Sequence, residues 1–138
     1  MKKITFLLVA FFAVATTFAQ KAPIQFTKTT HSFGKIKQNV PATYAFTFKN
    51  VSGQPVVIEN ATAECGCTDP QYPKSVIAKG GSNNIKVTFN AAAPGVFTKK
   101  VTVKVANTPQ PIILNITGEV VAASTAAKPS TASKKKSS

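Results

Sequence analysis

The residues that specific recognition and catalysis depend on are scarce in this chain. It has no arginine and no tryptophan, and only one histidine and four acidic residues. Arginine supplies the bidentate contacts that readers of nucleic-acid sequence use, so its absence argues against a specific nucleic-acid partner. The acids and the histidine are too few and too scattered to indicate an acid–base pair. We therefore predict that the protein is not an enzyme.

Amphipathic helices are also missing from the pattern. No window combines apolar residues at helical spacing with capping residues. A glycine-rich loop that binds phosphate is followed by a helix, so the sequence predicts no such phosphate site. The chain instead alternates apolar and polar residues, as half-buried strands do, between clusters of Gly, Pro and Asn. This pattern predicts an all-β, immunoglobulin-like antiparallel sandwich of about seven short strands. The expected strands lie around 24–26, 33–36, 44–49, 56–58, 85–89, 101–105 and 112–118. Phe89 and Phe97 are expected in its core.

The two ends of the chain differ from its middle. Segment 1–19 has a basic start, an apolar run and small residues before Gln20, which is typical of a secretory signal peptide. Its apolar run is shorter than the ~20 residues that span a bilayer. Segment 122–138 holds small polar residues and lysines that cannot offset chain entropy by burial. We predict a signal peptide at 1–19, one domain at 20–121 and a disordered tail at 122–138. The protein is expected to be exported, periplasmic or secreted, and not to span a membrane.

The charge is strongly one-sided. The chain has seventeen lysines and four acidic residues, which gives a net charge of +13. Without the lysines of the signal and the tail, eleven lysines and four acidic residues give the domain a net charge of +7. Lysines without arginine favour a diffuse, salt-sensitive attraction to anionic surfaces, to which the basic tail adds. We expect the partner to be another envelope or secreted protein.

Five segments follow one another in an order that is typical of a known family. They are His31–Ile36, Phe46–Asn50, Cys65–Lys74, Gly95–Val101 and Leu114–Val120. On these segments the chain is similar to a domain-of-unknown-function family of exported bacterial proteins, marked by a Cys-Gly-Cys-Thr signature on an immunoglobulin-like sandwich. It is also similar in fold to the major sperm protein and to cilium-associated sandwich domains. The resemblance covers about residues 24–121 and implies fold and export, but no activity.

Cys65 and Cys67 are the only cysteines, and they lie one residue apart. In an extended strand such residues stand about 6.6 Å apart, near the upper limit for a disulfide, and Gly66 is expected to let the chain turn more tightly. One alternative is a local disulfide or a pair of buried thiols. A second is a copper or zinc site of Cys65, Cys67 and His31, completed by Glu64 or Asp69. A third is an exchangeable disulfide in which Lys74 or Lys79 lowers a thiol pKa.

The leading hypothesis is a small exported binding or structural module without a cofactor. Its contact surface is expected to be formed by exposed strand edges, which can pair with an extended partner, and by the loop 64–74. The binding residues expected in this loop are Cys65, Gly66, Cys67, Thr68, Tyr72 and Lys74.

Overall fold

A computed structural model describes residues 20–122 of the chain. The predicted signal peptide, and all of the predicted tail except Ala122, lie outside the described residues. Between residues 20 and 122 there is no helix long and apolar enough to cross a membrane.

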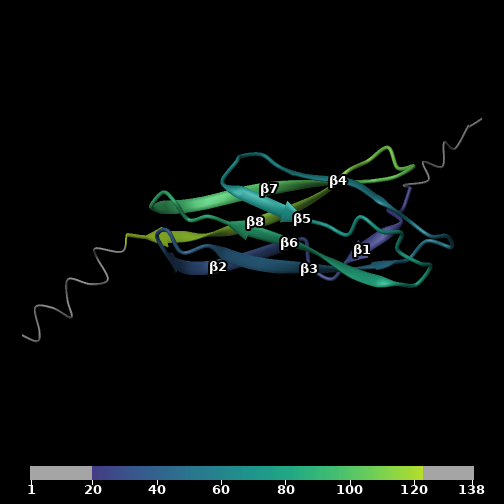
Figure 1. The fold of residues 1–138 in the computed structure, drawn as a ribbon, viewed down its shortest axis with the longest axis horizontal. Coiled ribbons are helices and arrows are strands. Elements are labelled where there is room, and N and C mark those ends of the chain that lie inside the picture. The colour runs from purple at the N-terminus through teal and green to yellow at the C-terminus, as the bar shows by residue number, and fades with distance from the viewer. Residues whose placement is uncertain (1–19, 123–138) are drawn as a thin grey trace, which may run out of the picture.

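Eight strands form two four-stranded sheets packed face to face (Figure 1). The first sheet has the order β1-β3-β6-β5 and the second β2-β8-β7-β4. The strands are β1 (Ile24–Phe26), β2 (Thr30–Lys37), β3 (Ala42–Asn50), β4 (Ile58–Ala63), β5 (Thr68–Gln71), β6 (Ser82–Phe89), β7 (Gly95–Val105) and β8 (Ile112–Val121). The prediction of an immunoglobulin-like β-sandwich is confirmed.

Three details differ from the sequence prediction. β2 pairs with β8 in parallel rather than antiparallel, which alternation along one strand cannot reveal. β5 is a strand where the sequence indicated a loop; it contains Pro70, which a sheet tolerates at an edge, and β5 pairs only with β6. The segment expected as a strand at 56–58 gives only a bridge from Val56 to Ile77, and β4 begins at Ile58.

The core lies between the sheets and follows the predicted alternation. Phe46 and Phe48 of β3 are buried, and so are most inward-facing residues of β6, β7 and β8, namely Ile85, Val87, Phe89, Phe97, Val101, Val103, Val105, Leu114, Ile116 and Val120. Phe89 and Phe97 stack across the sheets with ring centroids 4.1 Å apart. The expected core aromatics are therefore confirmed.

Gly118 lets Phe97 sit against β8. A Cβ atom built on Gly118 would lie 2.8 Å from Phe97 Cζ and 2.9 Å from the carbonyl oxygen of Gly34. Carbon atoms pack at about 3.5–4.0 Å, so no side chain fits there without displacing the phenylalanine or the backbone. β8 thus contributes to the core in two ways: through its own apolar side chains, and through a glycine that leaves room for the Phe97 ring.

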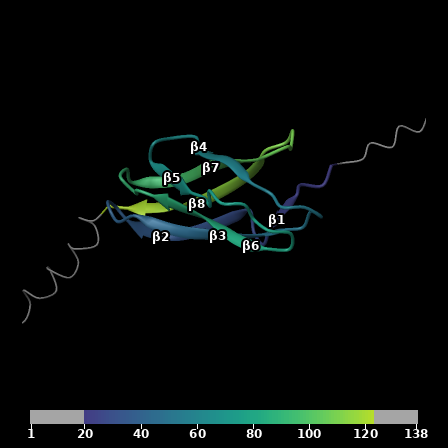
Figure 2. The same ribbon diagram turned by 45° about the vertical axis from the view of Figure 1, so that its right-hand side comes forward.

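The chain crosses between the sheets at both edges of the sandwich. Figures 1 and 2 place β5 beside β4 on one side and β2 beside β3 on the other, in agreement with the contacts between these elements. The residues that join β4 to β5 include both cysteines. We call residues 64–67 the disulfide loop.

Candidate functional site: the disulfide loop end

Cys65 and Cys67 form a disulfide in this structure, with Cα atoms 5.3 Å apart. The separation is shorter than in an extended strand because the chain turns at these residues. In this turn the amide of Thr68 donates a hydrogen bond to the carbonyl of Cys65 at 3.4 Å. Gly66 makes this turn without a left-handed conformation, and a Cβ atom placed on it would meet nothing within 4 Å. The chain does turn tightly at Gly66, as expected, but the residue does not use the left-handed dihedrals that are open to glycine.

Thr68 places its hydroxyl beneath the bridge. The residue is 5 % exposed, and its Oγ1 lies 3.8 Å from the Sγ atoms of both Cys65 and Cys67. A bridged sulfur carries no hydrogen, so the hydroxyl is the donor, and sulfur is a weak acceptor. Thr68 begins β5 and faces inward, so the fold itself fixes this position.

A hollow of about 200 Å³ lies beside the disulfide loop. Cys67, Phe89 and Phe97 line it together with Lys99, and the rest of the lining comes from the β6–β7 turn and the start of β7, namely Asn90, Ala92, Ala93, Pro94, Gly95 and Val96. We call this space the hollow. Val96 is 84 % exposed. An apolar side chain left so exposed beside a concave apolar surface is a common mark of a contact site.

Backbone hydrogen bonds hold the loops of this end together. The amide of Asn90 donates to the carbonyl of Cys67 at 2.9 Å, joining the β6–β7 turn to the disulfide loop. The amide of Asn39 donates to the carbonyl of Ala91 at 2.8 Å, joining the same turn to the β2–β3 turn. Ala91 adopts a positive φ of 54°, which brings its carbonyl to that donor. The hollow therefore has fixed walls.

Lys99 is the lysine that lines the hollow together with Cys67. It occupies an inward-facing position of β7, between the buried residues Phe97 and Val101, and is itself half-buried. The sequence interpretation proposed Lys74 or Lys79 for this place and missed Lys99. A signal was available, because the alternation of Phe97 with the valines of β7 puts a lysine where the pattern demands an apolar residue.

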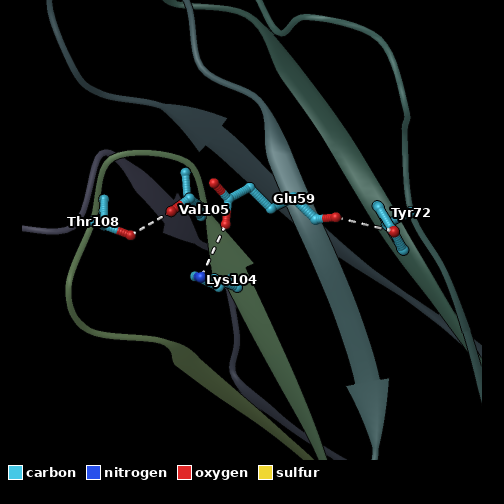
Figure 3. Close-up of polar contacts among 5 residues, drawn as sticks. All are labelled: Glu59, Tyr72, Lys104, Val105 and Thr108. Atoms are coloured by element: carbon cyan, nitrogen blue, oxygen red, sulfur yellow. Dashed lines mark hydrogen bonds and ion pairs between the residues drawn. The ribbon is translucent and has the colours of Figure 1, made fainter.

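Tyr72 and Lys74 lie apart from the disulfide loop. β5 separates Thr68 from Tyr72 by roughly 13 Å, because four extended residues rise ~3.3 Å each. The Tyr72 hydroxyl donates to the carbonyl of Glu59 at 3.3 Å, and the Lys74 Nζ lies 3.5 Å from the centre of the Tyr72 ring. Figure 3 shows Tyr72 on one side of Glu59 and Lys104, its ion-pair partner at 3.2 Å, on the other. The expected binding residues therefore form two groups at different places.

Tyr72 also covers part of an open strand edge. β4 has β7 as its only partner in the sheet, so its outer edge is the side that an added strand would use. The bond to the Glu59 carbonyl occupies one acceptor near the start of that edge. Pairing with an extended partner along the whole of β4 would require Tyr72 to move.

His31 lies on β2, at the opposite edge of the sheet from β4. Three strand spacings of ~4.8 Å separate these strands, so the structure does not gather His31 with the cysteines. Its ring stacks on Tyr44, with centroids 3.6 Å apart, and meets Phe33 edge-on. Burial, and to a lesser degree the charge of Lys28, lowers the pKa of His31 below its ordinary value of 6.5.

Glu64 and Asp69, named as further ligands, flank the cysteines along the chain, and both are exposed. Among residues 20–122, no three groups of the His, Cys, Asp and Glu types come together as a metal site would require.

The chain matches the model of one protein family. The chain belongs to the family described as protein of unknown function, DUF1573, whose model matches residues 24–120. This match confirms the family resemblance drawn from the sequence segments, and it assigns no activity. No curated protein matches the chain.

Solved structures similar to the DUF1573 chain share its architecture. A protein of unknown function from Porphyromonas gingivalis W83 has a TM-score of 0.61 at 12 % identity, over 75 % of this chain and 51 % of that one. The PapD-like domain 7 of human CEP192 has a TM-score of 0.59 at 9 % identity, over 73 % and 87 %. The Caenorhabditis elegans MSP family member WR4 has a TM-score of 0.53 at 8 % identity, over 73 % and 100 %.

At these identities the likenesses establish the fold alone. They confirm the predicted immunoglobulin-like sandwich and its similarity in fold to the major sperm protein, and they add a PapD-like domain as a structural neighbour. The chain spans about half the length of the Porphyromonas gingivalis protein.

Proposed function

We propose that this DUF1573 chain is an exported, non-enzymatic binding module that contacts another envelope protein through its disulfide loop end. The observation that carries the proposal is Val96, 84 % exposed at the rim of the hollow. Neighbouring backbone hydrogen bonds fix this surface before any partner arrives, and such pre-formed sites lose less entropy on binding.

The size of the hollow favours a side chain over a metabolite. Pockets for small molecules generally occupy ~300–1,000 Å³, whereas this one measures about 200 Å³. It is large enough for one apolar side chain of a partner, held between Phe97, Pro94 and the rim residue Val96. A single apolar anchor in such a pocket is how many protein contacts obtain most of their free energy.

The charge around the hollow favours an acidic partner. Lys99 lines the hollow, and the outer face carries Lys100 on β7 and Lys35 on β2, both exposed. Three acids also lie at this end: Glu119 pairs in register with Val96 and with Lys35, and Glu64 and Asp69 flank the cysteines. The chain leaves β8 here, because Val120 pairs with Gly95 at the start of β7, and the segment that follows contains four lysines. The proposed occupant is a leucine or phenylalanine flanked by Asp or Glu in a partner chain.

Titration with a synthetic peptide tests the proposal. The peptide carries one leucine between acidic residues, and backbone NMR signals of the labelled protein report where it binds. We expect the largest shifts at Val96, Phe97 and Lys99, and binding that weakens as salt rises from 50 to 300 mM. Val96→Ser should weaken binding about tenfold, as for an anchor worth ~1.4 kcal/mol.

A matched valine provides the control. Val76 is 62 % exposed and lies beside Ile77, away from the hollow. Val76→Ser should leave peptide binding unchanged. Equal effects of the two substitutions, shifts centred on Val76, or no binding by either an acidic or a neutral peptide would remove the hollow as a contact site.

A further inference from the structure

We propose that Cys65–Cys67 is an exchangeable disulfide, which oxidises a partner dithiol while the sandwich stays folded. Four observations carry this inference: the small structural value of the bridge, its access to solvent, the hydroxyl of Thr68 and the position of Lys99. It does not depend on the partner proposed above, because a small dithiol can react with the bridge as well.

The bridge contributes little to the fold. It closes a loop of three residues, Cys65 to Cys67. The chain-entropy relation gives a loop of that length only about half the stabilisation of a fifteen-residue loop. β4 and β5 on either side are held by their own ladders with β7 and β6. Reducing the bridge therefore leaves both sheets paired.

The bridge is open to attack from solvent. Both cysteines are half-buried rather than buried, and Gly66 between them is exposed. No atom outside residues 65–67 lies within 4 Å of the position that a Cβ on Gly66 would occupy, so no other part of the described chain covers that side of the loop. A structural disulfide that is meant to last is usually shielded in the core, whereas labile ones are exposed.

Thr68 favours the reduced form over the bridged form. Among residues 20–122 its buried Oγ1 has no hydrogen-bond partner other than the two sulfurs, each at 3.8 Å. A bridged sulfur is a weak acceptor, but a thiolate accepts a charge-assisted hydrogen bond about twice as strong as a neutral one. Stabilising the reduced form makes a disulfide more oxidising.

Cys67 is the better leaving sulfur. It packs against the core and lines the hollow together with Lys99, whereas Cys65 does neither. A nearby ammonium favours the thiolate form of a cysteine, and a sulfur with a lower thiol pKa leaves faster. Attack at Cys65 therefore places the departing charge where the Thr68 hydroxyl and Lys99 can stabilise it.

The reaction balances in two steps. A thiolate of the partner dithiol attacks Cys65 Sγ; a bond forms between these two sulfurs, the Cys65–Cys67 bond breaks, and Cys67 leaves as thiolate. The partner's second thiolate then attacks its own sulfur in this mixed disulfide, and Cys65 leaves as thiolate. The partner becomes a disulfide, and this chain takes up two electrons and two protons to become a dithiol.

Equilibration with dithiothreitol at pH 8 tests the role of Thr68. Thiols are counted by alkylation and mass spectrometry, and circular dichroism follows the fold. We expect full reduction with the β-sheet spectrum unchanged. Thr68→Val should lower the equilibrium constant for reduction about tenfold, the worth of one hydrogen bond to a charged group. Thr68→Ser, which keeps the hydroxyl, should behave like the parent. Thr43→Val, which removes a hydroxyl bonded to Thr88 on the outer face, is the matched control.

Trapping tests the order of the two cysteines. Each single variant is mixed with a bis-cysteine peptide whose thiols are bridged, so that its one remaining thiol can form a mixed disulfide. Cys67→Ala leaves Cys65 exposed and should accumulate the mixed species; Cys65→Ala should do so at least several-fold more slowly. Reduction only on unfolding, a Thr68→Val constant equal to that of the parent, or equal trapping by both variants would overturn the assignment.

Discussion

The two ends of the sandwich are closed by different chemistry. At the end opposite the hollow, Asn50 is 1 % exposed, and its amide donates to the carbonyls of Gln54, Ile77 and Ala78 at 2.7–3.2 Å. Its Oδ1 accepts from the amide and the hydroxyl of Ser52. At the disulfide loop end, apolar packing around Phe97 and a three-residue bridge take the place of such a network.

This difference separates a structural end from the proposed contact end. Every polar atom of the Asn50 side chain has a partner inside the protein, so nothing there remains for a ligand. At the other end Val96 is exposed, and the Thr68 hydroxyl has only sulfur atoms as acceptors. Buried polar groups usually have strong hydrogen-bond partners, so a buried group with only weak acceptors, such as the Thr68 hydroxyl, points to a candidate functional site.

The largest expected effect is at the structural end. Asn50→Ala removes the donor from three carbonyls and should lower the free energy of unfolding by about 3 kcal/mol, the cost of leaving buried acceptors without partners. Urea unfolding measures the change. Asn83→Ala, at an exposed asparagine of β6, should change stability by less than about 0.5 kcal/mol. Similar losses in the two variants would contradict the role of Asn50.

The next effect concerns packing at the proposed contact end. Gly118→Val places methyl groups where Phe97 already lies, and it should cost about 1–3 kcal/mol, as overpacked cores do. The double variant Gly118→Val with Phe97→Ala should lose less than the sum of the two single variants, because the smaller residue vacates the space. Strict additivity in urea unfolding would show that the two residues do not compete for it.

A smaller effect is expected from the bridge. Replacing both Cys65 and Cys67 by serine should lower the unfolding free energy by no more than about 1.6 kcal/mol, because the loop that they close is short. Gly66→Ala should change it by less than about 0.5 kcal/mol, since Gly66 has open space and no positive φ. Failure of the double serine variant to fold would make the bridge a structural staple after all.

The smallest effect is a pH dependence from His31, which belongs to neither end. Its pKa is lowered in the folded protein, so the unfolded chain binds the proton more readily. Stability therefore falls as pH decreases through 6.5 and levels off below the folded-state pKa. His31→Phe, which keeps the stack on Tyr44, should flatten the stability profile between pH 7 and 5. An unchanged slope would assign the pH dependence to another group.

Much of the fold could be predicted because the alternation of apolar and polar residues within one strand shows which side chains face the core. Alternation in segments such as 101–105 reveals which side chains face the core, and the structure buries those valines. β5 was hidden from this approach, since Pro70 and the short length of the strand resemble a loop. Its extended shape is supported by pairing with β6, a contact between segments that no local pattern records.

The candidate site was predictable in part. The sequence indicated Cys65 and Cys67 because they are the only two cysteines and lie one residue apart. Thr68 was predicted as a binding residue because it belongs to the same Cys-Gly-Cys-Thr signature. Lys99 and Val96 did not, because their importance depends on lying beside a loop some thirty positions away in the chain. Tyr72 and Lys74 were grouped with the cysteines only because proximity along a loop was taken for proximity in space.

The sequence by itself determined that this DUF1573 protein is a β-sandwich, which residues face its core, and where its two cysteines lie. These properties follow from side-chain period and from residue identity, which act over a few positions. The tertiary structure alone decided that β2 runs parallel to β8, that His31 is distant from the cysteines, that the Thr68 hydroxyl approaches the disulfide and that Lys99 lines the same hollow as Cys67. Those relations depend on how distant strands pair and stack, and a single strand contains no information about its neighbours.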